Sequence, residues 1–92
     1  MVLYSKKMFY VYVIESTKGD LYFGSTNDLK RRLKEHQKGI SFATKGRDWS
    51  LIYYEAYMAE SDARRREQRI KDFEQASRQL KERFKESRRH HS

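Results

Sequence analysis

The first third of the chain carries a hydrophobic pattern typical of a β-hairpin. Residues 9–14 form a continuous run of β-branched and aromatic side chains, as in a strand that is covered on both faces. Residues 18–20 (Lys-Gly-Asp) are a turn signal, and strand character resumes over residues 21–23. We expect Gly24 to end this second strand.

The hydrophobic spacing then changes to that of an amphipathic helix, from about residue 27 or 28 to residue 38. Leu29, Leu33 and His36 fall on one face of this helix, at positions i, i+4 and i+7. The polar residues before Leu29 suit a helix N-cap, and Gly39 suits the position that follows a helix end. Both boundaries therefore agree with the spacing.

The second half of the chain predicts one further strand and two further helices. Residues 40–47 indicate a loop and residues 49–58 a third strand, and Ser61 or Asp62 is expected to cap the following helix. Apolar side chains recur at helical intervals in both helices: Ala63, Ile70 and Phe73, then Ala76, Leu80 and Phe84. The order β-β-α-β-α-α predicts an α+β fold, a small three-stranded antiparallel sheet flanked by helices.

Length and composition narrow the class of protein. The 92 residues suit one domain over residues 9–84, with residues 1–8 as an N-terminal extension and the basic residues 85–92 as a flexible tail. The absence of cysteine excludes disulfides and thiolate zinc sites and favours a cytoplasmic location. No apolar run reaches the ~18 residues of a membrane span, and no signal peptide is visible.

The chain is strongly basic. It has 21 Lys and Arg residues against 13 Asp and Glu, a net charge of +8. This excess favours a polyanionic partner, either a nucleic acid or an anionic membrane surface. Leu80 and Phe84 are too few apolar residues for firm membrane insertion of the last helix, so a nucleic acid is the better partner.

Tyrosine stands out among the residues that could carry chemistry. The sequence has no Walker-type loop, no Gly-x-Gly-x-x-Gly and no His-Glu-x-x-His. Most of its seven tyrosines suit positions in a small sheet. Tyr12 and Tyr22 differ because one stands on each arm of the predicted hairpin, and Tyr22 is followed by Gly24 and then by the basic helix.

Three segments, taken in order, resemble the GIY-YIG nuclease family. They are Val11-Tyr12, then Tyr22-Phe23-Gly24, then residues 28–36 (Asp-Leu-Lys-Arg-Arg-Leu-Lys-Glu-His). The resemblance covers about residues 9–73 and is strongest to small stand-alone bacterial members. A more remote resemblance is to the N-terminal nuclease domain found in the endonuclease of nucleotide-excision repair. The glycine of the first motif is Tyr10 here, and Ser25 stands where some members carry a lysine.

The resemblance implies metal-dependent hydrolysis of DNA phosphodiester bonds, with one Mg²⁺ or Mn²⁺ ion per site. Tyr12 would act as the general base or position the water, its pKa lowered from about 10 by nearby cations. Tyr22 would hydrogen-bond the water or the phosphate. Arg32, on the margin of the apolar helix face, would clamp the phosphate. Glu67 would be the metal ligand, since hard cations favour carboxylate oxygen.

Two of these assignments have structural alternatives. His36 could assist the phosphate or a proton transfer, or it could be a core histidine on the apolar helix face. Glu67 could be an i,i+4 partner in a charged helix, because the helical wheel places Arg66 nearer the apolar stripe. Glu55 is the rival carboxylate, and it could equally pair with an arginine.

Further residues are expected to contact the nucleic acid backbone: Gly24, Ser25, Lys30, Arg31, Lys34, Thr44, Lys45 and Arg47. A non-catalytic nucleic-acid-binding module with the same fold is the alternative function. The sequence leaves open whether the substrate is branched or damaged DNA, or RNA. DNA repair is one of several pathways left open, as is a homodimer or a larger repair or restriction partner. We expect a bacterial, nucleoid-associated location in the cytoplasm.

Overall fold

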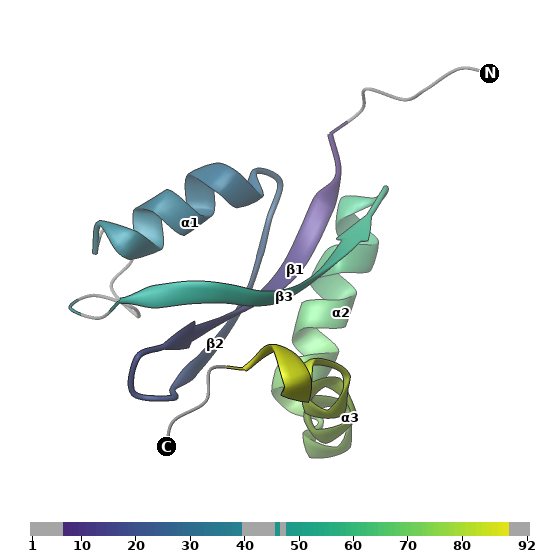
Figure 1. Ribbon diagram of the computed structural model, residues 1–92. Coiled ribbons are helices and arrows are strands. Elements are labelled where there is room, and N and C mark those ends of the chain that lie inside the picture. The colour runs from purple at the N-terminus through teal and green to yellow at the C-terminus, as the bar shows by residue number, and fades with distance from the viewer. Residues whose placement is uncertain (1–6, 40–45, 47, 89–92) are drawn as a thin grey trace.

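An antiparallel sheet of three strands in the order β2-β1-β3 forms the centre of the molecule (Figure 1). The computed structural model describes residues 7–39, 46 and 48–88. The predicted loop at 40–47 therefore lies almost wholly outside the described residues. The strands are β1 (Phe9–Ser16), β2 (Leu21–Thr26) and β3 (Trp49–Tyr57).

Helices cover both faces of the sheet. One face carries α1 (Leu29–Gln37), and the other carries α2 (Glu60–Asp72) and α3 (Glu74–Phe84), which continues into the 3₁₀ turn η2 (Lys85–Ser87). The order β-β-α-β-α-α confirms the predicted α+β fold. Within the described part of the chain, no helix has the length and apolarity needed to cross a membrane.

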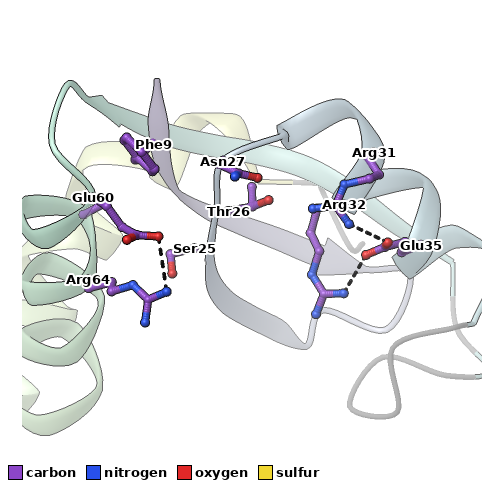
Figure 2. A pocket seen from close by; sticks show the side chains of 10 residues that line it. Phe9, Ser25, Thr26, Asn27, Arg31, Arg32, Glu35, Glu60 and Arg64 are labelled. Atoms are coloured by element: carbon purple, nitrogen blue, oxygen red, sulfur yellow. Dashed lines mark hydrogen bonds and ion pairs between the residues drawn. The ribbon is translucent and has the colours of Figure 1, made fainter. Parts of the chain in front are cut away.

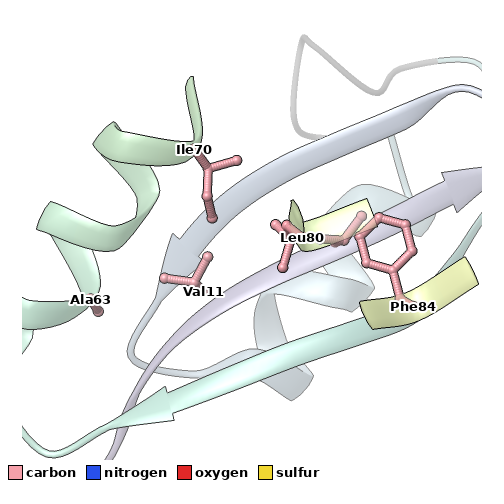
Figure 3. Close-up of a cluster of buried hydrophobic side chains, with 6 residues drawn as sticks. Val11, Ala63, Ile70, Leu80 and Phe84 are labelled. Atoms are coloured by element: carbon pink, nitrogen blue, oxygen red, sulfur yellow. The ribbon is translucent and has the colours of Figure 1, made fainter. Parts of the chain in front are cut away.

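The face of the sheet toward α2 and α3 carries the larger hydrophobic core. Val11 and Val13 of β1 point to this face, because side chains alternate along a strand. They pack with four buried side chains of the two helices, labelled in Figure 3: Ala63, Ile70, Leu80 and Phe84. The predicted apolar stripes are confirmed for these four residues.

The opposite face carries a smaller core beneath α1. Tyr12 and Ile14 of β1 point to this side and pack with Trp49, Leu29 and Leu33. Strand β1 is thus covered on both faces, as its continuous apolar run predicts. The two leucines confirm the predicted apolar face of α1.

The prediction that Gly24 ends the second strand is wrong. Strand β2 continues to Thr26, because Gly24 pairs with Tyr12 and Thr26 pairs with Tyr10 in the β1–β2 register. Gly24 therefore lies inside a strand. A glycine in this position often marks the close approach of another group, and the side chain of Tyr12 makes this approach, as described below.

Two predictions about α2 are also wrong. The helix begins at Glu60, before Ser61 or Asp62, and its N-cap is Ala59, whose methyl group accepts no hydrogen bond. The carboxylates of Glu60 and Asp62 lie in the first turn, where the helix dipole favours negative charge. Phe73 lies between α2 and α3 with an extended backbone and is 55% exposed, so it leaves the apolar stripe.

The end of the described chain folds back onto the β1–β2 hairpin. Arg88 donates from Nε to the Glu15 carboxylate at 2.8 Å, and from Nη2 to the Gly19 carbonyl at 2.9 Å. Glu15 is fully buried, so this charged partner offsets part of the cost of enclosing its carboxylate. Arg88 therefore contacts the domain, while residues 85–87 form an exposed 3₁₀ turn, and the flexible tail expected for 85–92 stays a prediction. Residues 89–92 lie outside the described part.

Replacing Arg88 with glutamine is expected to lower the free energy of unfolding by about 2–3 kcal/mol, because the buried Glu15 carboxylate loses its guanidinium partner. The loss is smaller than for a fully enclosed pair because the Arg88 side chain is 34% exposed. Lys85→Gln removes only an exposed pair with Glu82 and is expected to change the stability by less than about 0.5 kcal/mol. Urea unfolding of both variants tests this, and equal losses would contradict it.

Candidate active site

Four of the predicted site residues meet beneath α1. Tyr12 and Tyr22 occupy positions on the same face of the hairpin, with ring centroids 6.4 Å apart. The ring centroid of His36 lies 5.7 Å from that of Tyr12 and 5.1 Å from that of Tyr22. The Tyr12 hydroxyl lies 2.7 Å from Nε2 of His36. Arg32 adjoins both tyrosine hydroxyls and completes the cluster.

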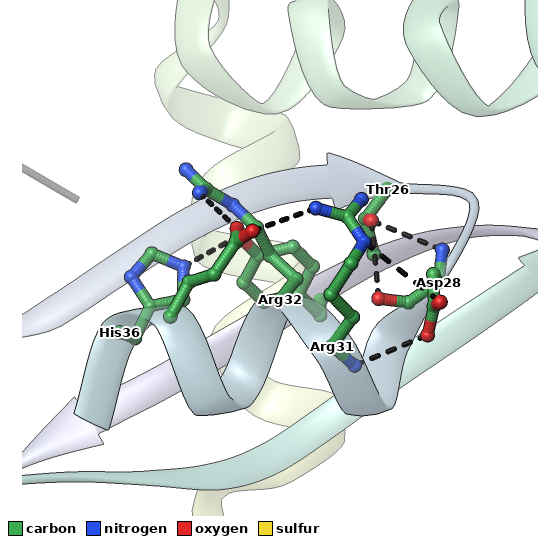
Figure 4. A network of polar contacts seen from close by, with 7 residues as sticks. Thr26, Asp28, Arg31, Arg32 and His36 are labelled. Carbon is green, nitrogen blue, oxygen red and sulfur yellow. Dashed lines mark hydrogen bonds and ion pairs between the residues drawn. The ribbon is translucent and has the colours of Figure 1, made fainter. Parts of the chain in front are cut away.

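Short-range hydrogen bonds fix the start of α1 (Figure 4). The Asp28 carboxylate accepts from the backbone N–H of Arg31 at 3.1 Å, and the Thr26 hydroxyl accepts from the backbone N–H of Asp28 at 3.1 Å. Asp28 is therefore the N-cap of α1, and it is one of the polar residues before Leu29 that suit this position. The cap fixes where α1 begins, so that Arg32 and His36, one turn apart, both reach the tyrosines.

A carboxylate that Arg32 shares with Arg31 holds it in place. Nη1 of Arg32 donates to Oε1 of Glu35 at 2.8 Å, and Nη1 of Arg31 donates to Oε2 at 2.7 Å. The hydrogen bond to Glu35 raises the pKa of Arg32, and hydrogen bonding to Tyr12 and Tyr22 raises it further. The guanidinium therefore remains charged beside both tyrosines. The same contact with Arg32 lowers the pKa of Glu35.

The pKa of Tyr12 moves in the direction opposite to the one expected. Tyr12 is fully buried, and burial raises its pKa to about 12, outweighing the hydrogen bond and charge of Arg32, which lower it. Burial, aided by the charge of Arg32, lowers the pKa of His36. At neutral pH Tyr12 is therefore a protonated phenol that is hydrogen-bonded to a neutral imidazole. The expectation of a lowered Tyr12 pKa is wrong, because the burial of the Tyr12 side chain depends on contacts between distant segments of the chain.

The side chain of Tyr12 explains the glycine of the second motif. A Cβ atom on Gly24 would lie 2.6 Å from the Tyr12 hydroxyl oxygen and 2.7 Å from Cζ, closer than real Cβ contacts. We expect Gly24→Ala to displace the Tyr12 ring and to lower the free energy of unfolding by about 1–3 kcal/mol. Thermal unfolding and near-UV circular dichroism measure the two effects. Native values for both would contradict the close fit.

Glu67 lies on the other side of β2, which is an edge strand of the sheet. Its Oε1 accepts from the Ser25 hydroxyl at 2.6 Å, and its Oε2 pairs with Nζ of Lys71 at 2.6 Å. Ser25 points to this side because it pairs with Val11 in the register. The charge of Glu67 still contributes to the raised pKa of Tyr12. The candidate site therefore straddles the edge strand.

Glu67 offers a single carboxylate to a metal ion. Among the residues that the structure describes, no group of three or more His, Cys, Asp or Glu side chains could hold an ion. The carboxylate of Glu67 and the adjacent Ser25 hydroxyl are hard oxygen donors. They fit an ion such as Mg²⁺, which keeps several of its waters. The ammonium group of Lys71 would have to leave Oε2 for such an ion to bind there.

The rival carboxylate, Glu55, belongs to a structural network. Nε and Nη2 of Arg66 donate to its two oxygens at 2.9 and 3.1 Å, and the hydroxyls of Tyr53 and Tyr57 donate at 2.8 and 2.6 Å. Burial alone would raise the pKa of Glu55. The hydrogen bonds from Arg66 and the two tyrosines outweigh this and lower it to about 2. Glu55 therefore anchors α2 to β3.

A pocket of about 370 Å³ adjoins the site between α1 and the start of α2 (Figure 2). Arg32 and Ser25 line it, so it is continuous with both halves of the site. Asn27, Glu60 and Arg64 also line it. Glu60 gives no signal in the sequence, because a single polar residue at an exposed position belongs to no motif or spacing pattern.

Only some of the residues predicted to contact nucleic acid belong to the part of the chain that the structure describes. Lys30, Arg31 and Lys34 are exposed on α1, away from its apolar face. Thr44, Lys45 and Arg47 lie outside the residues that the structure describes. Helix α1 thus presents a basic outer surface beside the pocket.

The sequence and the fold together define the class of protein to which this chain belongs, a class of catalytic domains. Residues 8–86 match the GIY-YIG catalytic domain, whose family members are typically endonucleases. The chain therefore belongs to the GIY-YIG family, as its tyrosine motifs predict.

Relatives from distant organisms share this domain. The chain is 40% identical over 74 residues to a UPF0213 protein of Halobacterium salinarum, covering 78% of this chain and 96% of that protein. It is 39% identical over 74 residues to a UPF0213 protein of Streptococcus agalactiae, covering 78% and 81%. The solution NMR structure of the protein EF2693 from E. faecalis aligns with a TM-score of 0.58 and 28% identity, covering 98% of this chain and 99% of that one. These UPF0213 relatives are small stand-alone members of the family.

Proposed function

We propose that this protein is a metal-dependent endonuclease that hydrolyses phosphodiester bonds in DNA. The observation that carries the proposal is the convergence of Tyr12, Tyr22, Arg32 and His36 on one side of β2, with the Glu67 carboxylate on the other side. This arrangement offers a proton acceptor, a fixed positive charge and a metal ligand within one small site. Each of these three can lower the barrier to hydrolysis of a phosphodiester.

Tyr12 and His36 act together on the attacking water. Because the Tyr12 hydroxyl remains protonated and lies 2.7 Å from Nε2 of His36, it accepts the proton of the water only as it passes its own proton to the imidazole. Tyr12 is buried, and Arg32 both contacts its hydroxyl and lines the pocket. The pocket is therefore the side from which a water and a phosphate would reach the Tyr12 hydroxyl.

Arg32 and Glu67 act on the phosphate. The Arg32 guanidinium offers a planar pair of donors to the phosphate oxygens and stabilises the charge that develops on them. Tyr22 contributes a second hydroxyl beside it. A Mg²⁺ or Mn²⁺ ion on Glu67, when bound, would relieve charge on the leaving oxygen. Lys71 pairs with the Glu67 carboxylate at 2.6 Å and would have to leave it for such an ion to bind.

The pH dependence of cleavage follows from the neutral state of His36. A protonated imidazole accepts no proton from Tyr12, so activity falls as His36 becomes charged. Burial and the charge of Arg32 lower its pKa below 6.5, with an opposing effect from Glu35. We expect kcat/KM to stay constant from about pH 8 to 6.5 and to fall only below that range. An acid limb centred at or above pH 6.5 would contradict this assignment.

A cleavage assay tests the proposal. The purified protein is incubated with labelled duplex, flap, bubble and single-stranded DNA, and with single-stranded RNA, in Mg²⁺, Mn²⁺ or EDTA. Metal-dependent cutting of DNA is the expected result, and the preferred substrate would identify the DNA shape. Salt-sensitive DNA binding without cutting in either metal would overturn the proposed nuclease activity in favour of a non-catalytic binding module. A nucleoid-associated location, a homodimer and a repair or restriction partner remain predictions.

A further inference from the structure

The pocket between α1 and α2 has the features of a second phosphate site. We propose that it binds the phosphate next to the scissile one on the cleaved DNA strand, with Arg64 as its principal contact. This inference rests on the proposed function and deepens it, because it defines the path of the strand across the edge of the sheet.

The composition of the pocket suits one unit of a sugar–phosphate backbone. At about 370 Å³ it is near the lower end of the roughly 300–1,000 Å³ range of ligand pockets. Phe9 and Ala63 contribute apolar surface, which suits a deoxyribose ring. Figure 2 shows Arg64 and Arg32 on opposite sides, with Ser25 and Asn27 between them. Guanidinium, amide and hydroxyl donors therefore surround the space.

The charges around the pocket leave an excess of positive charge. On the α1 side, Arg31 and Arg32 share the single carboxylate of Glu35. On the α2 side, Arg64 pairs with Glu60 at 3.2 Å, and their side chains are 72% and 55% exposed. An exposed i,i+4 pair of this kind contributes little to stability. Arg64 can therefore leave Glu60 for a phosphate, with which a guanidinium forms two parallel hydrogen bonds.

The pocket is continuous with the catalytic cluster. Arg32 lines the pocket and also contacts Tyr12, while Ser25 lines the pocket and donates to Glu67. A phosphate held by Arg32 at the reacting position therefore has the pocket directly beside it. The next phosphate of the same strand is the anion that chain connectivity would deliver there.

Arg64→Gln tests the proposal, with Arg65→Gln as a matched control. Arg65 is the next residue of α2, is 70% exposed and pairs with Asp62, but it does not line the pocket. The two variants have the same net charge, so they differ only in position. Affinity for labelled DNA is measured by fluorescence anisotropy in EDTA over a series of salt concentrations. Circular dichroism verifies that both variants fold.

We expect Arg64→Gln to weaken DNA binding about tenfold and to reduce the slope of log K against log salt by about one. Arg65→Gln is expected to change the affinity by less than about twofold. Equal effects of the two variants, with salt-sensitive binding by the native protein, would overturn the pocket assignment alone. Absence of DNA binding by the native protein would overturn the proposed function as well.

Chemically modified DNA locates the contact on the strand. A single neutral methylphosphonate replaces each phosphate near the cleavage position in turn, which removes one charge at a time. For the native protein and for Arg65→Gln, the modification next to the scissile phosphate is expected to weaken binding. For Arg64→Gln, the same modification is expected to have no further effect. Equal sensitivity of all three proteins at this position would contradict the assignment.

Discussion

Replacing Glu67 with glutamine is expected to lower the rate of DNA cleavage by about 10³-fold or more while leaving DNA affinity within about threefold. Glutamine keeps the shape of the side chain and can still accept from the Ser25 hydroxyl. It loses the negative charge that holds a divalent ion. Since such an ion contributes several kcal/mol of charge stabilisation in the transition state, its loss acts on the chemical step. Single-turnover cleavage and fluorescence anisotropy separate the two effects.

Glu82→Gln is the matched control for this experiment. Glu82 lies on α3 with an exposed side chain that pairs only loosely with Lys85, at 3.6 Å. The Glu82→Gln substitution makes the same chemical change far from the tyrosine cluster, and we expect the variant to cleave DNA at the native rate. A Glu67→Gln protein that cuts at the native rate would remove Glu67 as the metal ligand. Glu55 would not replace it, because four donors from Arg66, Tyr53 and Tyr57 already occupy its oxygens.

The sequence predicts much of the tyrosine side of the site, because local periodicity determines it. Tyr12 and Tyr22 stand on paired arms of a tight hairpin, and the period of two along each strand sends both rings to one face. The helical spacing from Leu29 to His36 places the histidine toward the sheet and Arg32 on the margin of the same face. The positions of these residues follow from patterns shorter than about ten residues, and the structure has them as predicted.

The remaining features depend on contacts between distant segments. The raised pKa of Tyr12 results from burial by residues of three elements, so no local pattern reveals it. The partners of Glu67 come from β2 and from the next turn of α2, and the wheel alone favours Arg66 over Glu67. Phe73 fits a helical stripe by spacing, but the backbone breaks at that residue and turns its ring outward.

Replacing Arg32 with lysine is expected to lower kcat by about 10²–10³-fold, although the positive charge is kept. Removing a single donor to a developing charge typically has an effect of this size. Arg32 contacts Glu35 and both tyrosine hydroxyls while it faces the pocket, and this requires the planar fork of a guanidinium. An ammonium group is a compact point charge that cannot make all of these contacts together. Lysine therefore keeps the attraction for DNA and loses the aligned contact in the transition state.

This prediction is specific because it expects a large loss of kcat together with almost no change in the affinity for DNA. Arg78→Lys, at an exposed position on α3, is the control, and we expect native values for both kcat and DNA affinity. For Arg32→Lys, the dissociation constant for DNA should change by no more than about threefold, and the pKa of His36 should rise as the nearby charge moves. NMR titration of the histidine measures this shift independently of activity. If Arg32→Lys lowered only the affinity for DNA and left kcat unchanged, the prediction would be wrong. Arg32 would then be one of several contacts to the DNA backbone, and the residue that holds the phosphate beside Tyr12 and His36 would be unassigned.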